Sequence, residues 1–165
     1  MDPAKSVVTI EVKKAGVLSA FGHDHEITAP LASGSVDPKG RKVELRWNAS
    51  ALQVSERGIS DKDRAEIQKT MLGPEVLDSG QYREIVFRST NAEPGGSGRW
   101  NVRGDFTLHN QTRPVMAEVR EEDGHYVGML RIRQTDFGIK PVKVAGGTVR
   151  VKDEVQIMFD IQLTP

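Results

Sequence analysis

The sequence predicts an all-β protein, built as an antiparallel sandwich or barrel, on two observations. First, apolar and polar residues alternate with a period of two through residues 6–14, 42–48, 99–109 and 154–163. Second, short clusters such as DPKG, EPGGSG and EEDG separate these segments, and their residue types favour turns. Many short strands with one apolar face and frequent turns are typical of antiparallel sheets that enclose a core.

The alternation also assigns a face to each regular strand, because successive side chains in a strand point to opposite sides. The residues expected to point inward are Val8, Ile10 and Val12, then Val43, Leu45 and Trp47, then Trp100, Val102, Phe106 and Leu108, and finally Val155, Ile157, Phe159 and Ile161. Less regular strands are predicted at 84–90, 114–120, 125–133 and 148–151, and the ASGS cluster at 32–35 is interpreted as a turn.

One segment departs from this period and predicts a single amphipathic helix over residues 61–72. Ser60 is a suitable N-cap, with Asp63 three residues later in a weak capping-box arrangement. Ile67 and Met71 lie four residues apart and share one side, and Gly73-Pro74 ends the helix. Because charged residues surround this narrow apolar stripe, we expect the helix on the barrel surface or across one end.

Length and composition favour one globular domain over residues 1–165. Lys plus Arg and Asp plus Glu number 23 each, and aromatic residues are only 5%, so nucleic-acid binding is poorly supported. No apolar run approaches the roughly 20 residues of a transmembrane helix, so no membrane span is predicted. Cysteine is absent from the sequence, which excludes disulfides and thiolate chemistry.

The N-terminal MDPAKS contains no hydrophobic segment of the kind found in signal peptides. The sequence is therefore compatible with a cytoplasmic protein, and equally with a periplasmic or secreted protein whose signal peptide has been removed. Its oligomeric state, including a homodimer, stays open.

Residues 20–27, AFGHDHEI, concentrate the chemically interesting side chains. In a strand, Phe21, His23, His25 and Ile27 share one face, and Asp24 lies with Glu26 on the other. The face with Phe21 and Ile27 is the expected interior, so both imidazoles should point inward. They could be hydrogen-bonded wall residues, or polar contacts in an apolar cavity that hold the polar end of a ligand.

Metal ligation and an enzymatic role are the two chemical alternatives for the same histidines. His23 and His25 on one strand face could ligate a transition metal, but a zinc site needs further ligands, and His109 and His125 lie far away in the sequence. An enzymatic role is not predicted, because the sequence lacks the common nucleophile, phosphate-loop, zinc-protease and paired-carboxylate signatures.

Three stretches match known signatures, at residues 76–90, 104–115 and 135–139, and together they resemble the YceI-like family of lipocalin-like polyisoprenoid-binding proteins. GDFTLHNQTRPV (104–115) is similar to the family signature G-D-L-T-x-x-G-x-T-[KR]-P-V, VLDSGQYREIVFRST (76–90) to F-F-D-x-x-x-Y-P-x-I-x-F-x-S, and TDFGI (135–139) to S-D-F-G-I. Asn110 stands at a family glycine, and we expect it in a left-handed turn. Arg83 at a family proline, the 55–72 segment and GHDHEI are the departures, and they surround the expected cavity entrance.

The resemblance implies an eight-stranded antiparallel lipocalin-like barrel that holds a long apolar molecule, such as an isoprenoid quinone, a polyprenyl phenol or an amphiphilic fatty compound. It implies no catalytic residue and no cofactor beyond such a bound lipid, and many family members are exported to the bacterial periplasm. The residues expected to line the cavity or its mouth are Phe21, His23, His25, Trp47, Phe87, Phe106, Leu108, Phe137 and Phe159.

The leading hypothesis is therefore non-enzymatic binding and carriage of an isoprenoid or other lipid-like small molecule. Two alternatives stay open at this point: a barrel that binds a transition metal through His23 and His25, and a filled barrel that acts through its surface as an interaction or stress protein.

Overall fold

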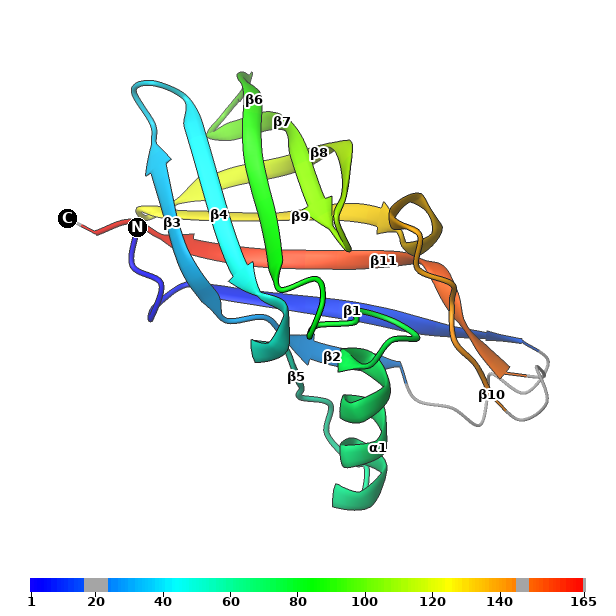
Figure 1. Ribbon diagram of the computed structural model, residues 1–165. Helices are drawn as coiled ribbons and strands as arrows, with labels where there is room; N and C mark the ends of the chain where they lie inside the picture. Colours follow the sequence, from blue (N-terminus) through cyan, green and yellow to red (C-terminus); the bar gives the residue numbers. More distant parts are fainter. Residues whose placement is uncertain (17–23, 145–148, 165) are drawn as a thin grey trace.

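The computed structural model describes residues 1–16, 24–144 and 149–164, and these form one curled antiparallel sheet with a single α-helix (Figure 1). The strands are β1 (Val7–Gly16), β2 (His25–Thr28), β3 (Leu31–Asp37), β4 (Lys42–Asn48), β5 (Gln53–Val54), β6 (Glu84–Gly96), β7 (Arg99–Leu108), β8 (Gln111–Glu122), β9 (His125–Arg133), β10 (Lys143–Val144) and β11 (Val149–Gln162). The helices are α1 (Asp61–Leu72) and two short 3-10 turns, η2 (Ala49–Ala51) and η3 (Gln134–Phe137).

The predicted barrel fold is confirmed. The eleven strands follow the order β3-β4-β6-β7-β8-β9-β11-β1-β2-β5, with β10 paired to β11. Only β2, β5 and β10 have fewer than seven residues, and they account for the difference from the eight strands expected. The sheet curls into a half-barrel around its apolar face (Figure 1).

A bent segment links the two sides of this half-barrel. β2 pairs with β1, β3 pairs with β4, and only Ala29-Pro30 separates β2 from β3. The Ala29 backbone N–H still donates to the Val8 carbonyl at 2.9 Å, so the chain leaves β1 only at the proline. One continuous stretch thus runs from β2, the strand next to the β5 edge, to β3 at the opposite edge, and it brings the apolar faces of the sheet together.

The inward faces are largely those that the alternation predicted. Val102, Gly104, Phe106 and Leu108 of β7 are buried, and the residues that alternate with them are exposed or partly buried. Leu45 and Trp47 of β4 and Val155, Ile157 and Ile161 of β11 also belong to the buried core. Side-chain parity along the strands was therefore sufficient to find most of the interior.

Two boundaries differ from the prediction. The ASGS cluster is part of β3 and is not a turn, because an edge strand tolerates small polar residues. A Cβ on Gly34 would lie 2.9 Å from a Leu45 side-chain carbon, so the small residue permits close packing against β4. Residues 149–162 form one strand where two were expected, and β6 continues through the first part of EPGGSG to Gly96.

The predicted helix is confirmed over residues 61–72. The Ser60 hydroxyl accepts from the Asp63 backbone N–H at 3.1 Å and donates to the Asp63 carboxylate at 2.8 Å. Met71 belongs to the buried core, and the helix ends before Gly73. Asn110 has φ of 56°, as expected for its left-handed turn between β7 and β8. None of the helices in the described part of the chain is long and apolar enough to cross a membrane.

Candidate functional site

Three apolar cavities follow one another through the inside of the half-barrel. The first, the β3–β4 cavity, has a volume of about 90 Å³ and lies next to the turn between those strands. The second, the central cavity, has a volume of about 100 Å³. The third, the helix pocket, has a volume of about 300 Å³ and lies between α1, β2 and the ends of β1, β10 and β11.

Neighbouring cavities share walls. Val8, Trp47, Phe106 and Ile157 line both the β3–β4 cavity and the central cavity. The walls common to the central cavity and the helix pocket are formed by Val12, Ile27, Met71, Val76 and Gln134. The interior is therefore a row of apolar spaces separated by single layers of side chains, narrower than one open tube.

The structure places several of the predicted ligand-binding residues around this row. Trp47 and Phe106 form the layer between two cavities, with their ring centroids 6.5 Å apart in an edge-to-face arrangement. Phe87 and Phe159 line the β3–β4 cavity, and Leu108 lines the central cavity.

Three other predicted residues stand apart. Phe137 is only 1% exposed and lines none of the three cavities, because η3 places it in the closed core with its ring centroid 5.7 Å from that of Phe106. Phe21 and His23 lie outside the described residues. The surroundings of Phe137 therefore do not support its assigned ligand-contact role, and the roles of Phe21 and His23 stay predictions.

Two glycines let aromatic rings lie close to the inner wall of the β3–β4 cavity. A Cβ built on Gly104 would lie 2.5 Å from the Phe87 ring, and one on Gly128 would lie 2.6 Å from the Phe159 ring. Both contacts are far shorter than real Cβ contacts, so any larger residue would push the ring away from the wall. The glycines thus keep space in the cavity that side chains would otherwise fill.

The sequence prediction overlooked the small residues of the same wall. Ala92 of β6 is opposite Val102 of β7, which is opposite Ala117 of β8, and all three line the β3–β4 cavity. Both alanines are buried, at 7% and 3% exposure. A buried row with two methyl side chains leaves room beside it, but a buried alanine in a sequence does not reveal whether its neighbours fill that room.

Tyr126 places a phenol hydroxyl at this wall. Burial raises the pKa of the Tyr126 hydroxyl above its ordinary value, and the neighbouring Glu121 carboxylate adds to the rise. The phenol therefore stays neutral.

At the helix pocket, His25 points inward as parity predicted and contacts a buried acid. Its Nδ1 lies 2.6 Å from Oε2 of Glu56, and the His25 and Glu56 side chains are 15% and 5% exposed. Asp24 and Glu26, its sequence neighbours, are both exposed. The second carboxylate oxygen of Glu56 has no hydrogen-bond partner among the described residues. The imidazole is thus the hydrogen-bond partner that keeps this carboxylate in the interior.

Glu56 was not predicted as a site residue, because it lies 31 positions from His25 and the sequence carries no signal that joins them. The pairing depends on β5, which follows the 3-10 turn η2 and pairs with β2 through Ile27 and Val54. Ser55 extends this contact, since its backbone N–H donates to the Glu26 carbonyl at 2.8 Å.

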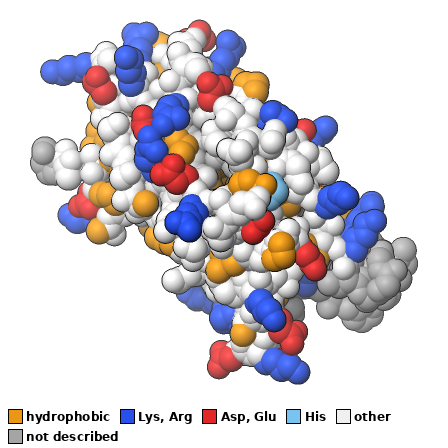
Figure 2. Space-filling model, in the orientation of Figure 1, with side chains coloured by type: hydrophobic (Ala, Val, Ile, Leu, Met, Phe, Trp, Pro, Cys, Tyr) orange, Lys and Arg blue, Asp and Glu red, His pale blue; other side chains and the backbone are white. Residues whose placement is uncertain are grey.

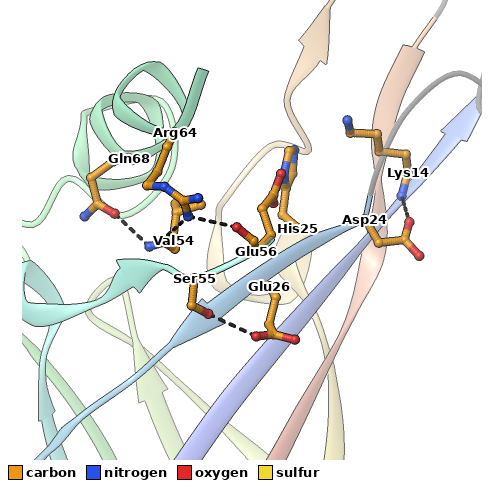
Figure 3. A network of polar contacts seen from close by, with 9 residues as sticks. All are labelled: Lys14, Asp24, His25, Glu26, Val54, Ser55, Glu56, Arg64 and Gln68. Carbon is orange, nitrogen blue, oxygen red and sulfur yellow. Dashed lines mark hydrogen bonds and ion pairs between the residues drawn. The ribbon is translucent and has the colours of Figure 1, made fainter. Parts of the chain in front are cut away.

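Helix α1 holds the other edge of β5 with two side chains four residues apart (Figure 3). The Gln68 amide accepts from the Val54 N–H and donates to the Leu52 carbonyl, both at 2.8 Å. The Arg64 guanidinium donates to the Glu56 carbonyl at 2.8 Å and to the Val54 carbonyl at 3.3 Å. These side chains satisfy backbone groups that a further strand would otherwise pair, and they fix Glu56 beside His25.

We expect Gln68→Ala to lower the free energy of unfolding by about 1–3 kcal/mol, because two backbone groups of the β5 region lose their partners. Urea denaturation measures this change. Lys69→Ala, on an exposed position of the same helix, is the control and should change stability by less than about 0.5 kcal/mol. Equal effects of the two substitutions would show that the Gln68 contacts do not stabilise this edge.

The metal alternative needs His23, which lies outside the described residues, and it stays a hypothesis. Over the described ranges 1–16, 24–144 and 149–164, no three His, Asp or Glu side chains are grouped as a metal site requires. His25 has Glu56 as its near partner, and His125 pairs with Asp160 at 2.7 Å on the other side of the sheet. The His109 ring packs against Tyr82, with ring centroids 4.0 Å apart and the ring planes tilted by 55°.

Comparison with known proteins agrees with the fold and with the motif resemblance. The model of the YceI-like domain matches residues 1–163. A UPF0312 protein of Vibrio parahaemolyticus is 32% identical over 107 residues, which cover 59% of this chain and 55% of that protein. A UPF0312 protein of Vibrio cholerae is 28% identical over 133 residues, which cover 74% of this chain and 66% of that protein. The matches therefore span just over half to about two thirds of these relatives.

Two solved structures share the fold at low sequence identity. BcnA of Burkholderia cenocepacia superposes with a TM-score of 0.73 at 19% identity, covering 96% of both chains. A YCEI protein of Campylobacter jejuni has a TM-score of 0.56 at 10% identity, covering 93% of this chain and 86% of its own.

Proposed function

Since the chain belongs to the YceI-like domain family, we propose that it binds and carries a long amphiphilic lipid, such as an isoprenoid, inside its barrel without acting as an enzyme. The family fold is a barrel for hydrophobic ligands, which supports a binding role. The finer points, namely the isoprenoid class of the ligand and a periplasmic site of action, belong to the same proposal.

The observation that carries this proposal is the row of three apolar cavities. Most of the residues that line the β3–β4 cavity and the central cavity are aliphatic or aromatic. A chain-like molecule that displaces the single layers between them could occupy the whole row, whereas a compact ligand would fill only one space. Each methylene group removed from water contributes about 0.8 kcal/mol, so a tail of modest length accounts for tight binding.

Side chains in the layers between the cavities can move to allow such displacement. Trp47 and Phe106 each contact two cavities, so a change of rotamer in either ring would join the spaces on its two sides. Met71 borders both the central cavity and the helix pocket, and methionine adapts its shape to irregular partners.

Direct identification of the bound molecule tests the proposal. Native mass spectrometry of the purified protein should show an added mass, and solvent extraction should release a molecule with a long hydrocarbon or isoprenoid tail. Protein freed of lipid and then incubated with geranylgeraniol should regain a mass increment of one ligand and unfold at a higher temperature.

The same two measurements, mass and thermal stability, can contradict the proposal. Lipid-free protein that gains neither mass nor thermal stability from geranylgeraniol, oleyl alcohol or a ubiquinone would contradict it. A protein stabilised by zinc but by none of these lipids would favour the metal alternative instead.

A further inference from the structure

The helix pocket differs from the other two cavities in its charge. Three basic side chains line it: Lys14 from β1, Lys143 from β10 and Arg150 from β11. Among the described residues that line the same pocket, Glu75 is the one acidic residue. Figure 2 shows several basic side chains on the right-hand side of the molecule.

The strand register brings Lys143 and Arg150 together on one face, and Lys14 joins them as a residue that lines the same pocket. Lys143 is directly opposite Arg150 in the β10–β11 pair, and Lys14 is opposite Val151, the next residue of β11. Like charges opposite one another in an antiparallel pair destabilise it. The arrangement therefore has an unfavourable electrostatic energy that a bound anion would relieve.

Carboxylates of the described residues do not neutralise this group. The ion pairs found within 4.0 Å among residues 1–16, 24–144 and 149–164 leave out Lys14, Lys143 and Arg150. Asp24 contacts Lys14, but through the backbone N–H at 3.1 Å, and in Figure 3 the Lys14 ammonium extends away from that carboxylate. The buried Glu56 contacts the ring of His25.

The same pocket has an apolar floor that leads inward. Val12, Ile27 and Met71 line both the helix pocket and the central cavity. Basic groups at the rim and aliphatic groups below them match a molecule with a negative head and an apolar tail. At the opposite end of the row, Arg41 and Lys42 line the β3–β4 cavity together with Asp37.

We propose that the lipid carried by this protein has an anionic head, a carboxylate or a phosphate, held among Lys14, Lys143 and Arg150, with its tail in the central cavity. This inference rests on the proposed lipid-binding function and names the class of its ligand. His25 lines the same pocket beside the head, with its ring engaged by Glu56.

Matched ligand pairs test the charge of the head. Lipid-free protein is first loaded with the neutral fluorescent probe 1-aminoanthracene. Separate titrations then displace the probe with the two members of each pair: oleate and oleyl alcohol, and geranylgeranyl phosphate and geranylgeraniol. We expect the charged member of at least one pair to bind roughly tenfold more tightly, as two or three partly exposed ion pairs would provide. A preference confined to oleate identifies a carboxylate, and one confined to the phosphate identifies a phosphate.

Substitutions show which residues cause the tighter binding of the charged ligand. Lys14→Ala/Lys143→Ala/Arg150→Ala should remove the preference for the charged ligand and leave the affinity for its alcohol unchanged. Arg41→Ala/Lys42→Ala at the opposite end should retain the preference. The inference is overturned if wild-type protein binds acid and alcohol equally, or if the triple variant keeps the preference. Failure of all four ligands to displace the probe would instead contradict lipid binding itself, and the head-group assignment with it.

Discussion

The double substitution Ala92→Leu/Ala117→Leu is expected to weaken the binding of a long-chain lipid by at least about tenfold. Both alanines line the β3–β4 cavity, whose volume is about 90 Å³, and they flank Val102 in one cross-strand row. Two leucine side chains would occupy the space that the tail needs. Excluding only two methylene groups of the tail removes about 1.6 kcal/mol of binding free energy, slightly more than a factor of ten.

Probe displacement by geranylgeraniol measures this loss, and urea denaturation checks the fold. The new side chains enter an existing void, so we expect a cost of no more than about 2 kcal/mol in unfolding free energy. Ala65→Leu, on an exposed position of α1, is the matched control and should bind like the wild type. Unchanged affinity in the folded double variant would show that the tail does not enter the β3–β4 cavity.

The second large effect is expected for Glu56→Ala, which should lower the free energy of unfolding by about 2–3 kcal/mol. The Glu56 side chain is 5% exposed and lies 2.6 Å from the His25 ring nitrogen, so its removal leaves a cavity and an unpaired imidazole nitrogen. Because β5 contacts the sheet through only two residue pairs with β2, the loss should also loosen the β5–α1 region.

Urea denaturation gives the global change, and amide hydrogen exchange in β5 and α1 gives the local one. Glu26→Ala serves as the control, since that exposed acid makes only a 3.2 Å hydrogen bond with Ser55, and it should cost less than about 0.5 kcal/mol. In a double-mutant cycle, His25→Ala should cost less in the Glu56→Ala background than alone. Additive effects would show that the two side chains do not stabilise each other.

The sequence was informative wherever a local rule decides the structure. Alternation placed Trp47, Phe106 and Leu108 on the inner face, and parity pointed His25 and Ile27 the same way. Ser60, Asp63 and Gly73 set the bounds of α1 through backbone capping, which acts within a few residues. Asn110 was correctly assigned a left-handed turn for the same reason.

Local rules failed where small residues have two uses. Glycine and serine suit turns, and they also suit an edge strand that packs closely on its neighbour, so the turn predicted at residues 32–35 is wrong.

Phe137 shares the apolar character of the cavity residues, but η3 turns it into the filled core. Composition alone does not distinguish a packed aromatic ring from one that borders a void.

By itself, the sequence determined the fold class, the helix, the family and most of the inward faces, because these follow from short-range periodicity and motifs. The tertiary structure alone decided that His25 meets Glu56, that Lys14, Lys143 and Arg150 share one pocket, and that Ala92 and Ala117 leave space beside them. Those relations depend on strand register and on the curl of the sheet, which join residues far apart in the chain. The volume of a cavity and the net charge of its lining are defined only when those distant strands have come together.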